Sequence, residues 1–150
     1  MTAPDLAGLA TPCLLLDRDR MQANIDRMSA RADELGVRLR PHVKTCKSTD
    51  IARLMAGAEP SAITVSTLRE AEYFAAAGFD DILYAVSIAP QGLERVLALN
   101  ARGANVQVLL DAPETVREVA AGAAAAGQTL HAWIEIDVDG HRAGLPPDDP

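Results

Sequence analysis

The sequence is poor in aromatic residues, in cysteine and in long apolar runs. Aromatic residues make up 3% of the 150 positions, which argues against a stacking platform for bases or sugars. Two cysteines, Cys13 and Cys46, are too few for a disulfide framework, so we expect a reduced, cytoplasmic setting. No apolar run reaches the roughly 18–20 residues that span a bilayer, and the first residues lack the pattern of a secretory signal.

The chain is also short of positive charge. Its 14 basic residues stand against 21 acidic ones, which gives a formal net charge of −7. A nucleic-acid partner requires a basic face, so we expect neither a nucleic-acid nor a membrane partner. Hydrophobic residues make up 49% and charged residues 23% of the chain, which is ordinary usage for one globular domain of this length.

Lysine is nearly absent. Of the 14 basic residues, 2 are lysines, Lys44 and Lys47, which leaves 12 arginines. Both lysines fall in the heptapeptide 42–48, His-Val-Lys-Thr-Cys-Lys-Ser. Arginine stays protonated in proteins, whereas a partly buried lysine can lose its proton and act as a nucleophilic amine. The alternative is a compositional bias against lysine, and the composition alone favours neither explanation.

The apolar periodicity predicts alternating strands and helices. A short apolar run predicts a strand over 11–17, and apolar spacings of three and four predict a helix from Arg20 to Leu35 that ends at Gly36. Further strands are predicted over 37–45, 62–66, 81–86, 105–111 and 130–138, and further helices over 51–56, 68–77, 90–101 and 113–126.

The predicted order of elements indicates a parallel sheet. Strands recur about every 20–26 residues, a spacing that suits right-handed crossovers between parallel strands. Two layouts agree with this order: an open doubly wound sheet, or a partial (β/α)8 TIM-type barrel. No G-x-G-x-x-G motif follows the first strand, which weakens the first layout. The barrel layout would leave an exposed sheet edge, so we expect a fragment or a half-barrel that needs a partner.

Segment 37–45 carries the most suggestive side chains. Arg40, His42 and Lys44 alternate along this predicted strand, so they share one face. Such a cluster on a buried strand is costly unless an anionic group lies nearby. Repulsion and partial desolvation would favour the neutral amine of Lys44, which is the form that attacks an aldehyde. The alternative is that these side chains reach solvent at a strand end, and Lys47 is expected to be a solvated or phosphate-attracting charge.

Loop 137–144, after the last predicted strand, is a second candidate. Arg142 can pair there with an anionic oxygen at the mouth of a barrel. Asp137, Asp139 and His141 alternate as metal ligands can, but an aspartate beside a turn glycine is usually a local cap. We therefore expect no metal ligands within this chain.

Other polar residues have simpler interpretations. Thr67 and Glu70 form a capping-box pattern at a helix start. His131, at a strand start, is expected to be structural. Cys46 is a minor candidate for thiol chemistry, and Tyr84 faces either the mouth of the barrel or the core.

Three segments, taken together, point to a family. Segment 11–17 contains Thr-Pro and Leu-Asp, segment 40–45 reads Arg-Pro-His-Val-Lys-Thr, and segment 135–144 reads Glu-Ile-Asp-Val-Asp-Gly-His-Arg-Ala-Gly. They resemble the D-threonine aldolase and D-serine dehydratase-like family, pyridoxal 5′-phosphate enzymes of the alanine-racemase fold type. The resemblance implies that residues 1–150 are the N-terminal part of a cofactor-binding barrel. It also implies that the rest of the barrel and a C-terminal β-domain lie outside this chain.

The resemblance also implies roles for particular residues. Lys44 corresponds to the lysine that forms the internal aldimine with pyridoxal 5′-phosphate, and Arg142 to an arginine near the pyridoxal ring. His42 and Arg40 correspond to residues that support the lysine strand, and His42 lies beside the cofactor. Cys46 departs from the family pattern, which often has histidine there. The phosphate-binding loops, and the ligands of a divalent metal where one is present, are expected outside this chain.

The resemblance predicts a lyase that acts on D-β-hydroxy amino acids, either by aldol cleavage or by dehydration. The first alternative is an amino-acid racemase that uses the same cofactor. The second is a non-catalytic cofactor carrier or a truncated barrel, and the third is an aldolase in which Lys44 attacks a sugar carbonyl without a cofactor. The expected partners are a small D-amino acid substrate and a second copy of the protein in a homodimer.

Overall fold

The computed structural model describes residues 6–57, 62–138, 140 and 143–148. The chain forms two compact units, Met1–Arg38 and Leu39–Pro150. The first unit contains helix α1 (Arg18–Leu35), which begins where the side chain of Asp17 accepts a hydrogen bond from the Arg20 amide and ends at Gly36 in a left-handed conformation. The predicted helix and its terminating glycine are confirmed. Gly36 closes the last turn with a positive φ of 63°, which glycine adopts without strain.

The strand predicted over 11–17 is wrong. None of the described residues pairs with this segment, and the side chain of Leu14 is fully exposed. An apolar run supplies side chains for a strand, but the backbone becomes a strand only when a neighbouring strand accepts and donates its hydrogen bonds.

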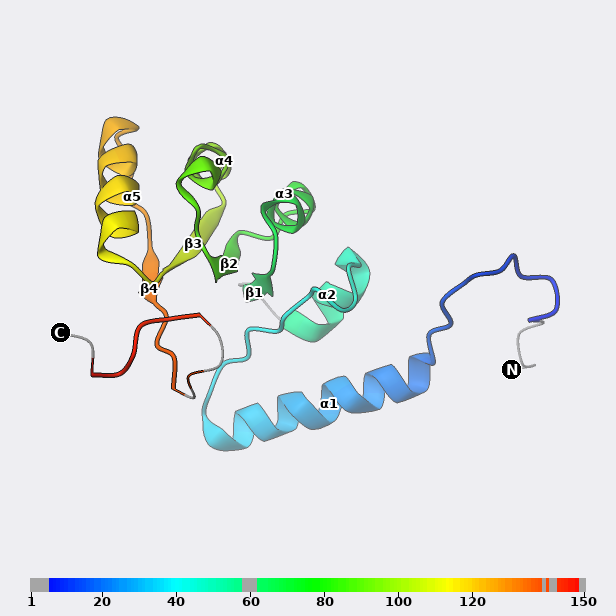
Figure 1. The fold of residues 1–150 in the computed structure, drawn as a ribbon. Helices are drawn as coiled ribbons and strands as arrows, with labels where there is room; N and C mark the ends of the chain where they lie inside the picture. Colours follow the sequence, from blue (N-terminus) through cyan, green and yellow to red (C-terminus); the bar gives the residue numbers. More distant parts are fainter. Residues whose placement is uncertain (1–5, 58–61, 139, 141–142, 149–150) are drawn as a thin grey trace. The chain divides into compact units, whose positions relative to one another are not determined.

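The second unit alternates helices and strands (Figure 1). After α2 (Thr49–Ala56) come β1 (Ala62–Val65), α3 (Leu68–Ala76), β2 (Asp81–Ser87), the short 3-10 turn η1 (Pro90–Gly92), α4 (Leu93–Asn100), β3 (Asn105–Leu110), α5 (Pro113–Ala125) and β4 (Ala132–Ile134). Each helix after β1 was predicted, and their boundaries follow local signals such as the N-terminal prolines of η1 and α5.

The sheet is parallel and its strands follow chain order, β1-β2-β3-β4. Helices α3, α4 and α5 lie on the same side of it (Figure 1). A doubly wound sheet would reverse its strand order at a switch point and carry helices on both faces. The observed order is that of a segment of a (β/α)8 barrel, and the partial-barrel prediction is confirmed.

The core lies between the sheet and these helices. Fully buried side chains alternate along the strands, as the period of two residues requires. They pack against buried helix residues such as Phe74. These strand residues are Ile63, Val65, Ile82, Val106 and Val108. Each contributes on the order of 1.5–3 kcal/mol by leaving water. The opposite face of the strands carries polar side chains such as Asp81 and Gln107 beside leucines such as Leu83 and Leu109.

Two predicted strands are shorter than expected. Segment 37–45 is reduced to one parallel bridge between His42 and Thr64, and the strand predicted over 130–138 is reduced to β4. Among the described residues, each of these segments has a strand neighbour on one side only, so fewer hydrogen bonds hold it extended. The predicted exposed edge is present among the described residues, because β4 is the last strand of the sheet and pairs with β3 alone.

Across the described ranges, the helices are all too short or too polar to be candidates for crossing a membrane.

Candidate functional site

Lys44 lies in a turn at the carboxyl edge of the sheet. Residues 43–46 form this turn directly after the bridge at His42, and the amide of Lys47 closes it by donating to the carbonyl of Val43 at 2.9 Å. Lys47 takes a positive φ of 46°, an uncommon conformation outside glycine. The Lys44 side chain is exposed, whereas the sequence predicted partial burial. The difference arises because Lys44 lies in the turn beyond the bridge and not within a strand.

His42 contacts the backbone of Lys44. Its Nδ1 atom lies 3.3 Å from the amide nitrogen of Lys44, and its Nε2 atom lies 3.3 Å from the Oγ atom of Ser66. Burial, followed by the positive charge of Lys44, lowers the pKa of His42 below its ordinary value, although Glu70 and a backbone hydrogen bond at Thr64 act in the opposite direction. The ring is thus held between the turn and the end of β1, in an environment that favours its neutral form.

Glu70 connects the start of α3 to the same turn. Half of the predicted capping box is confirmed, because the Oγ1 atom of Thr67 accepts a hydrogen bond from the Glu70 amide at 3.0 Å. The Glu70 carboxylate accepts a second hydrogen bond from the Ser66 amide at 2.8 Å and forms an ion pair with Lys47 at 3.3 Å. Lys47 is therefore exposed, as expected, but not a bare solvated charge. The ion pair is a feature that sequence reasoning missed.

Arg40 does not join His42 and Lys44. Its guanidinium donates to both carboxylate oxygens of Asp81, at 2.8 and 2.9 Å, and to the backbone carbonyl of the same residue at 3.2 Å. Asp81 begins β2, so Arg40 lies at the amino edge of the sheet, whereas the Lys44 turn lies at the carboxyl edge. The expected cluster of three cations on one face is therefore wrong, but the expected need for an anionic partner is confirmed for Arg40.

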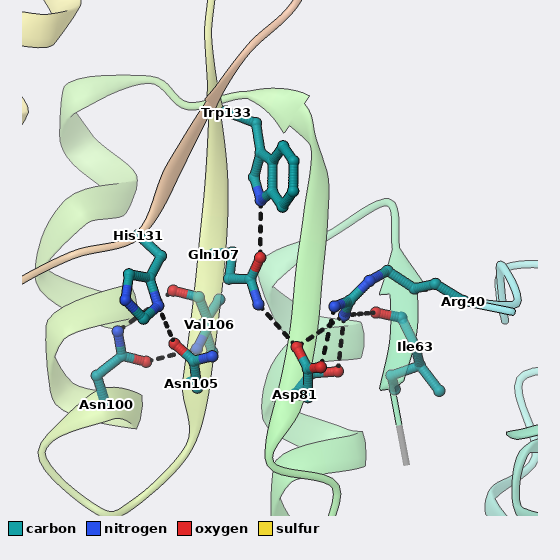
Figure 2. Close-up of polar contacts among 9 residues, drawn as sticks. All are labelled: Arg40, Ile63, Asp81, Asn100, Asn105, Val106, Gln107, His131 and Trp133. Atoms are coloured by element: carbon teal, nitrogen blue, oxygen red, sulfur yellow. Dashed lines mark hydrogen bonds and ion pairs between the residues drawn. The ribbon is translucent and has the colours of Figure 1, made fainter. Parts of the chain in front are cut away.

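The Arg40–Asp81 pair is one end of a row of polar contacts across the sheet (Figure 2). Gln107 of β3 donates from Nε2 to Oδ1 of Asp81 at 2.7 Å, and Trp133 of β4 donates from its indole nitrogen to Oε1 of Gln107 at 2.7 Å. We call these residues, Arg40, Asp81, Gln107 and Trp133, the transverse relay. Sequence reasoning missed it, although a glutamine in the middle of an apolar strand was a visible signal.

The second candidate, loop 137–144, is closed at its base. Ile136 and Leu145 form an isolated parallel bridge, and the amide of Leu145 donates to the carbonyl of Glu135 at 2.8 Å. Glu135 also accepts a hydrogen bond from the Oγ atom of Ser87, at 3.2 Å, which ties this loop to the end of β2. Asp139, His141 and Arg142 lie outside the described residues, so the proposed place of Arg142 beside the cofactor stays a prediction.

The remaining candidates, Cys46, Tyr84 and His131, make contacts within the fold. The Sγ atom of half-buried Cys46 donates to the carbonyl of Val43 at 3.5 Å. Tyr84 packs against the core. His131 lies 2.9 Å, through Nδ1, from the side-chain oxygen of Asn105 at the start of β3, which agrees with the predicted structural role (Figure 2).

Among the described side chains, one amine is available for covalent chemistry. Lys44 carries its amine on an exposed turn at the edge of the sheet where (β/α)8 barrels keep their reactive groups. Lys47, the other lysine, is engaged with Glu70. The chemistry that these residues can perform is the capture of a carbonyl group by the Lys44 amine, supported by His42 and Ser66 beneath the turn.

Known proteins with similar sequences include several lyases. The chain is 51% identical over 144 residues to the D-threo-3-hydroxyaspartate dehydratase of Delftia sp. strain HT23, a match that covers 96% of this chain and 38% of that protein. It is 32% identical over 143 residues to a D-threonine aldolase of an Arthrobacter species, covering 95% of this chain and again 38% of the relative. The chain thus spans less than two-fifths of the length of these relatives.

Solved structures show the same fold. An alanine racemase-like protein of Idiomarina loihiensis superimposes with a TM-score of 0.93 at 44% identity, over 99% of this chain and 40% of that one. The Delftia dehydratase superimposes with a TM-score of 0.90 over 95% of this chain and 38% of its own, and a variant of it was solved in a metal-free form. The family model described as "Alanine racemase, N-terminal domain" matches residues 16–150. The chain therefore belongs to the alanine racemase N-terminal domain family.

Proposed function

We propose that the protein containing this chain is a pyridoxal 5′-phosphate-dependent lyase that acts on D-amino acids with a β-hydroxyl group. The observation that carries the proposal is the position of Lys44, an accessible amine at the carboxyl edge of a barrel sheet. The relatives named above act, by their names, on D-threo-3-hydroxyaspartate and D-threonine. Both compounds are D-amino acids that carry a hydroxyl group on the β-carbon.

The residues of the turn suit the cofactor's aldehyde. A primary amine is the group that an aldehyde requires, and Lys44 offers its amine on the exposed side of the turn. Lys47, the other lysine, pairs with Glu70. In this proposal Lys44 holds the cofactor. His42 lies beside the cofactor and fixes the Lys44 backbone, and Arg142 approaches the ring from loop 137–144. Residues beyond this chain would bind the phosphate group.

When bound, pyridoxal 5′-phosphate supplies an electron sink that makes the bonds at the substrate's α-carbon easier to break. The residues of this chain hold the cofactor and orient the turn to which it is attached. Lys44 provides the attachment, and His42 and Ser66 fix the backbone beneath it. A divalent metal that orients or activates the β-hydroxyl would take its ligands from residues outside this chain.

Among β-hydroxy substrates, the comparisons favour dehydration over aldol cleavage. Identity to the named dehydratase is 51%, against 32% for the named D-threonine aldolase. We therefore propose loss of the β-hydroxyl as the main reaction and aldol cleavage as the alternative. A cytoplasmic location and a homodimer belong to the same proposal.

The proposal is tested with the full-length protein and pyridoxal 5′-phosphate. We expect a visible absorption band on binding, and borohydride reduction should then fix the cofactor on the peptide that contains Lys44. Lys44→Ala should abolish both signals. Lys47→Arg is the matched control, because it removes the other lysine amine and keeps the charge that faces Glu70. Attachment at another residue would contradict the proposal.

The reaction is distinguished by its products. D-threo-3-hydroxyaspartate, D-threonine and D-serine are supplied separately, and the mixture is scored for ammonia with a keto acid or for glycine with an aldehyde. Ammonia indicates dehydration and glycine indicates aldol cleavage. If neither appears and only the amino acid inverted at its α-carbon accumulates, the protein is a racemase instead.

A further inference from the structure

The imidazole of His42 has both nitrogens engaged, and one contact fixes its tautomer. The backbone amide of Lys44 can only donate a hydrogen bond, so Nδ1 of His42, 3.3 Å away, must be the acceptor. The neutral ring therefore carries its proton on Nε2. That N–H group donates to the Oγ atom of Ser66, also at 3.3 Å.

Ser66 is itself fixed by α3. Its amide donates to the Glu70 carboxylate at 2.8 Å, and the side chain of Glu70 is only 11% exposed. The other oxygen of that carboxylate pairs with Lys47 at 3.3 Å. Glu70 thus contacts the turn at both ends. One oxygen reaches the start of the turn through Ser66 and His42, and the other pairs with Lys47 at its end.

We propose that His42 is a positioning residue which, as the neutral Nε2–H tautomer, fixes the turn that carries Lys44 against the end of β1. The inference rests on the proposed function only in naming Lys44 as the reactive amine. His42 acts through the Lys44 backbone, because both of its ring nitrogens are already bonded to the protein.

A proton added to His42 would work against this arrangement. The proton would occupy Nδ1, which could then no longer accept from the Lys44 amide. Two N–H groups would face each other there. The charged groups around the ring are Lys44, which repels the imidazolium, and Glu70, which attracts it; the backbone hydrogen bond at Thr64 also favours the charged ring. Lys47 lies beyond Glu70 and partly neutralises that attraction.

Two substitutions separate the two hydrogen bonds of the ring. His42→Asn retains an oxygen close to the position of Nδ1, so it can still accept from the Lys44 amide. His42→Gln places its amide near the position of Nε2, so it can donate to Ser66 but offers no acceptor to Lys44. The two variants differ by one methylene group, and each is the control of the other.

The first experiment measures how fast Lys44 is trapped. The full-length protein and both variants are treated with pyridoxal 5′-phosphate and borohydride, and the labelled Lys44 peptide is quantified by mass spectrometry over time. We expect His42→Asn to react within about twofold of the natural protein and His42→Gln to react about tenfold more slowly, as the loss of one hydrogen bond allows. Equal rates in both variants, whether fast or slow, overturn the inference.

The second experiment tests the tautomer without any cofactor. Long-range proton–nitrogen NMR spectra of histidine-labelled protein distinguish the two neutral tautomers and follow protonation. We expect the Nε2–H form for His42, with a midpoint below that of an exposed histidine. An Nδ1–H form overturns the inference whatever the trapping shows. If Lys44 is not trapped in the natural protein, the proposed function fails, while the NMR result still decides the role of His42.

Discussion

At the residue scale, the site depends on a few side chains whose partners fix their chemistry. The motif at 40–45 made Lys44 and His42 visible in the sequence, because lysine occurs at only two positions of the chain. Their surroundings were not visible. Glu70 was identified as a helix cap, but its ion pair with Lys47 depends on a turn with a positive φ that no sequence rule indicated.

His42 should make the protein less stable in mild acid. Its pKa is lowered in the folded state, so on acidification the unfolded chain takes up the proton first. The stability that this residue contributes is complete above the usual histidine pKa of about 6.5 and falls as the pH drops from there through the lowered folded value.

Urea unfolding on either side of that pH measures the effect. His42→Gln should unfold with a weaker pH dependence than the natural protein, and the difference between the two isolates His42 from other titrating groups. Parallel pH profiles for the two proteins would show that the ring is not protected from protonation.

Gly144 should resist substitution. A Cβ atom at this position would lie 2.7 Å from the Asp137 amide nitrogen and 2.9 Å from the Ile136 carbonyl carbon, and its φ of +115° is strained for other residues. We expect Gly144→Ala to lower the free energy of unfolding by about 3 kcal/mol or more, since both backbone strain and overlap must be relieved.

Gly127 is the matched control for that substitution. It also has a positive φ, of +64°, but open space surrounds its Cβ position. Gly127→Ala should cost only about 1 kcal/mol. Comparable losses for the two variants in urea unfolding would show that the base of loop 137–144 yields easily.

At the scale of elements, the helices were easier to predict than the strands. A terminating glycine lies next to the helix that it ends, as at Gly36, so the sequence alone located it. Strands depend on neighbours that are distant in sequence. Segments 11–17 and 37–45 have the apolar content of strands, yet the first pairs with none of the described residues and the second forms a single bridge.

The transverse relay should contribute to the stability of the sheet. Arg40 and Asp81 are about three-quarters buried, with side chains 27% and 21% exposed. Asp81→Asn leaves the guanidinium without its charged partner, so we expect a loss of about 2–3 kcal/mol. Glu34→Gln removes the exposed pair with Arg31 and should change stability by less than about 0.5 kcal/mol.

Urea unfolding of both variants checks this expectation. The outcome that would contradict it is an equal, small effect for Asp81→Asn and Glu34→Gln. The pair with Asp81 would then be no stronger than an ordinary surface contact.

At the scale of the whole molecule, the periodicity of the sequence predicted the barrel correctly because each βα unit repeats the same architecture. It did not predict which side chains line the polar face, since Asp81 and Gln107 meet only when β2 and β3 pair in the observed register. Loop 137–144 was identified from its glycines and arginine, and its closed base arises from a contact between Ile136 and Leu145 that has no local signal.

We expect the 150-residue chain alone to bind pyridoxal 5′-phosphate weakly. It spans about 38% of the length of the named relatives, and the phosphate-binding residues are expected beyond it. Titration followed by absorption should show at least about a hundredfold weaker binding than the full-length protein, the equivalent of roughly 2.7 kcal/mol. Equal affinity would mean that residues 1–150 already contain the phosphate site.

The transverse relay ends at Trp133, the single tryptophan of the chain. The position of an indole's fluorescence maximum depends on the polarity and hydrogen bonding around its nitrogen, and here that nitrogen donates to Gln107. The protein thus carries an intrinsic optical reporter at one end of a row that begins at Arg40. A disturbance at Arg40 can therefore be followed as a spectral shift at β4, with no label attached.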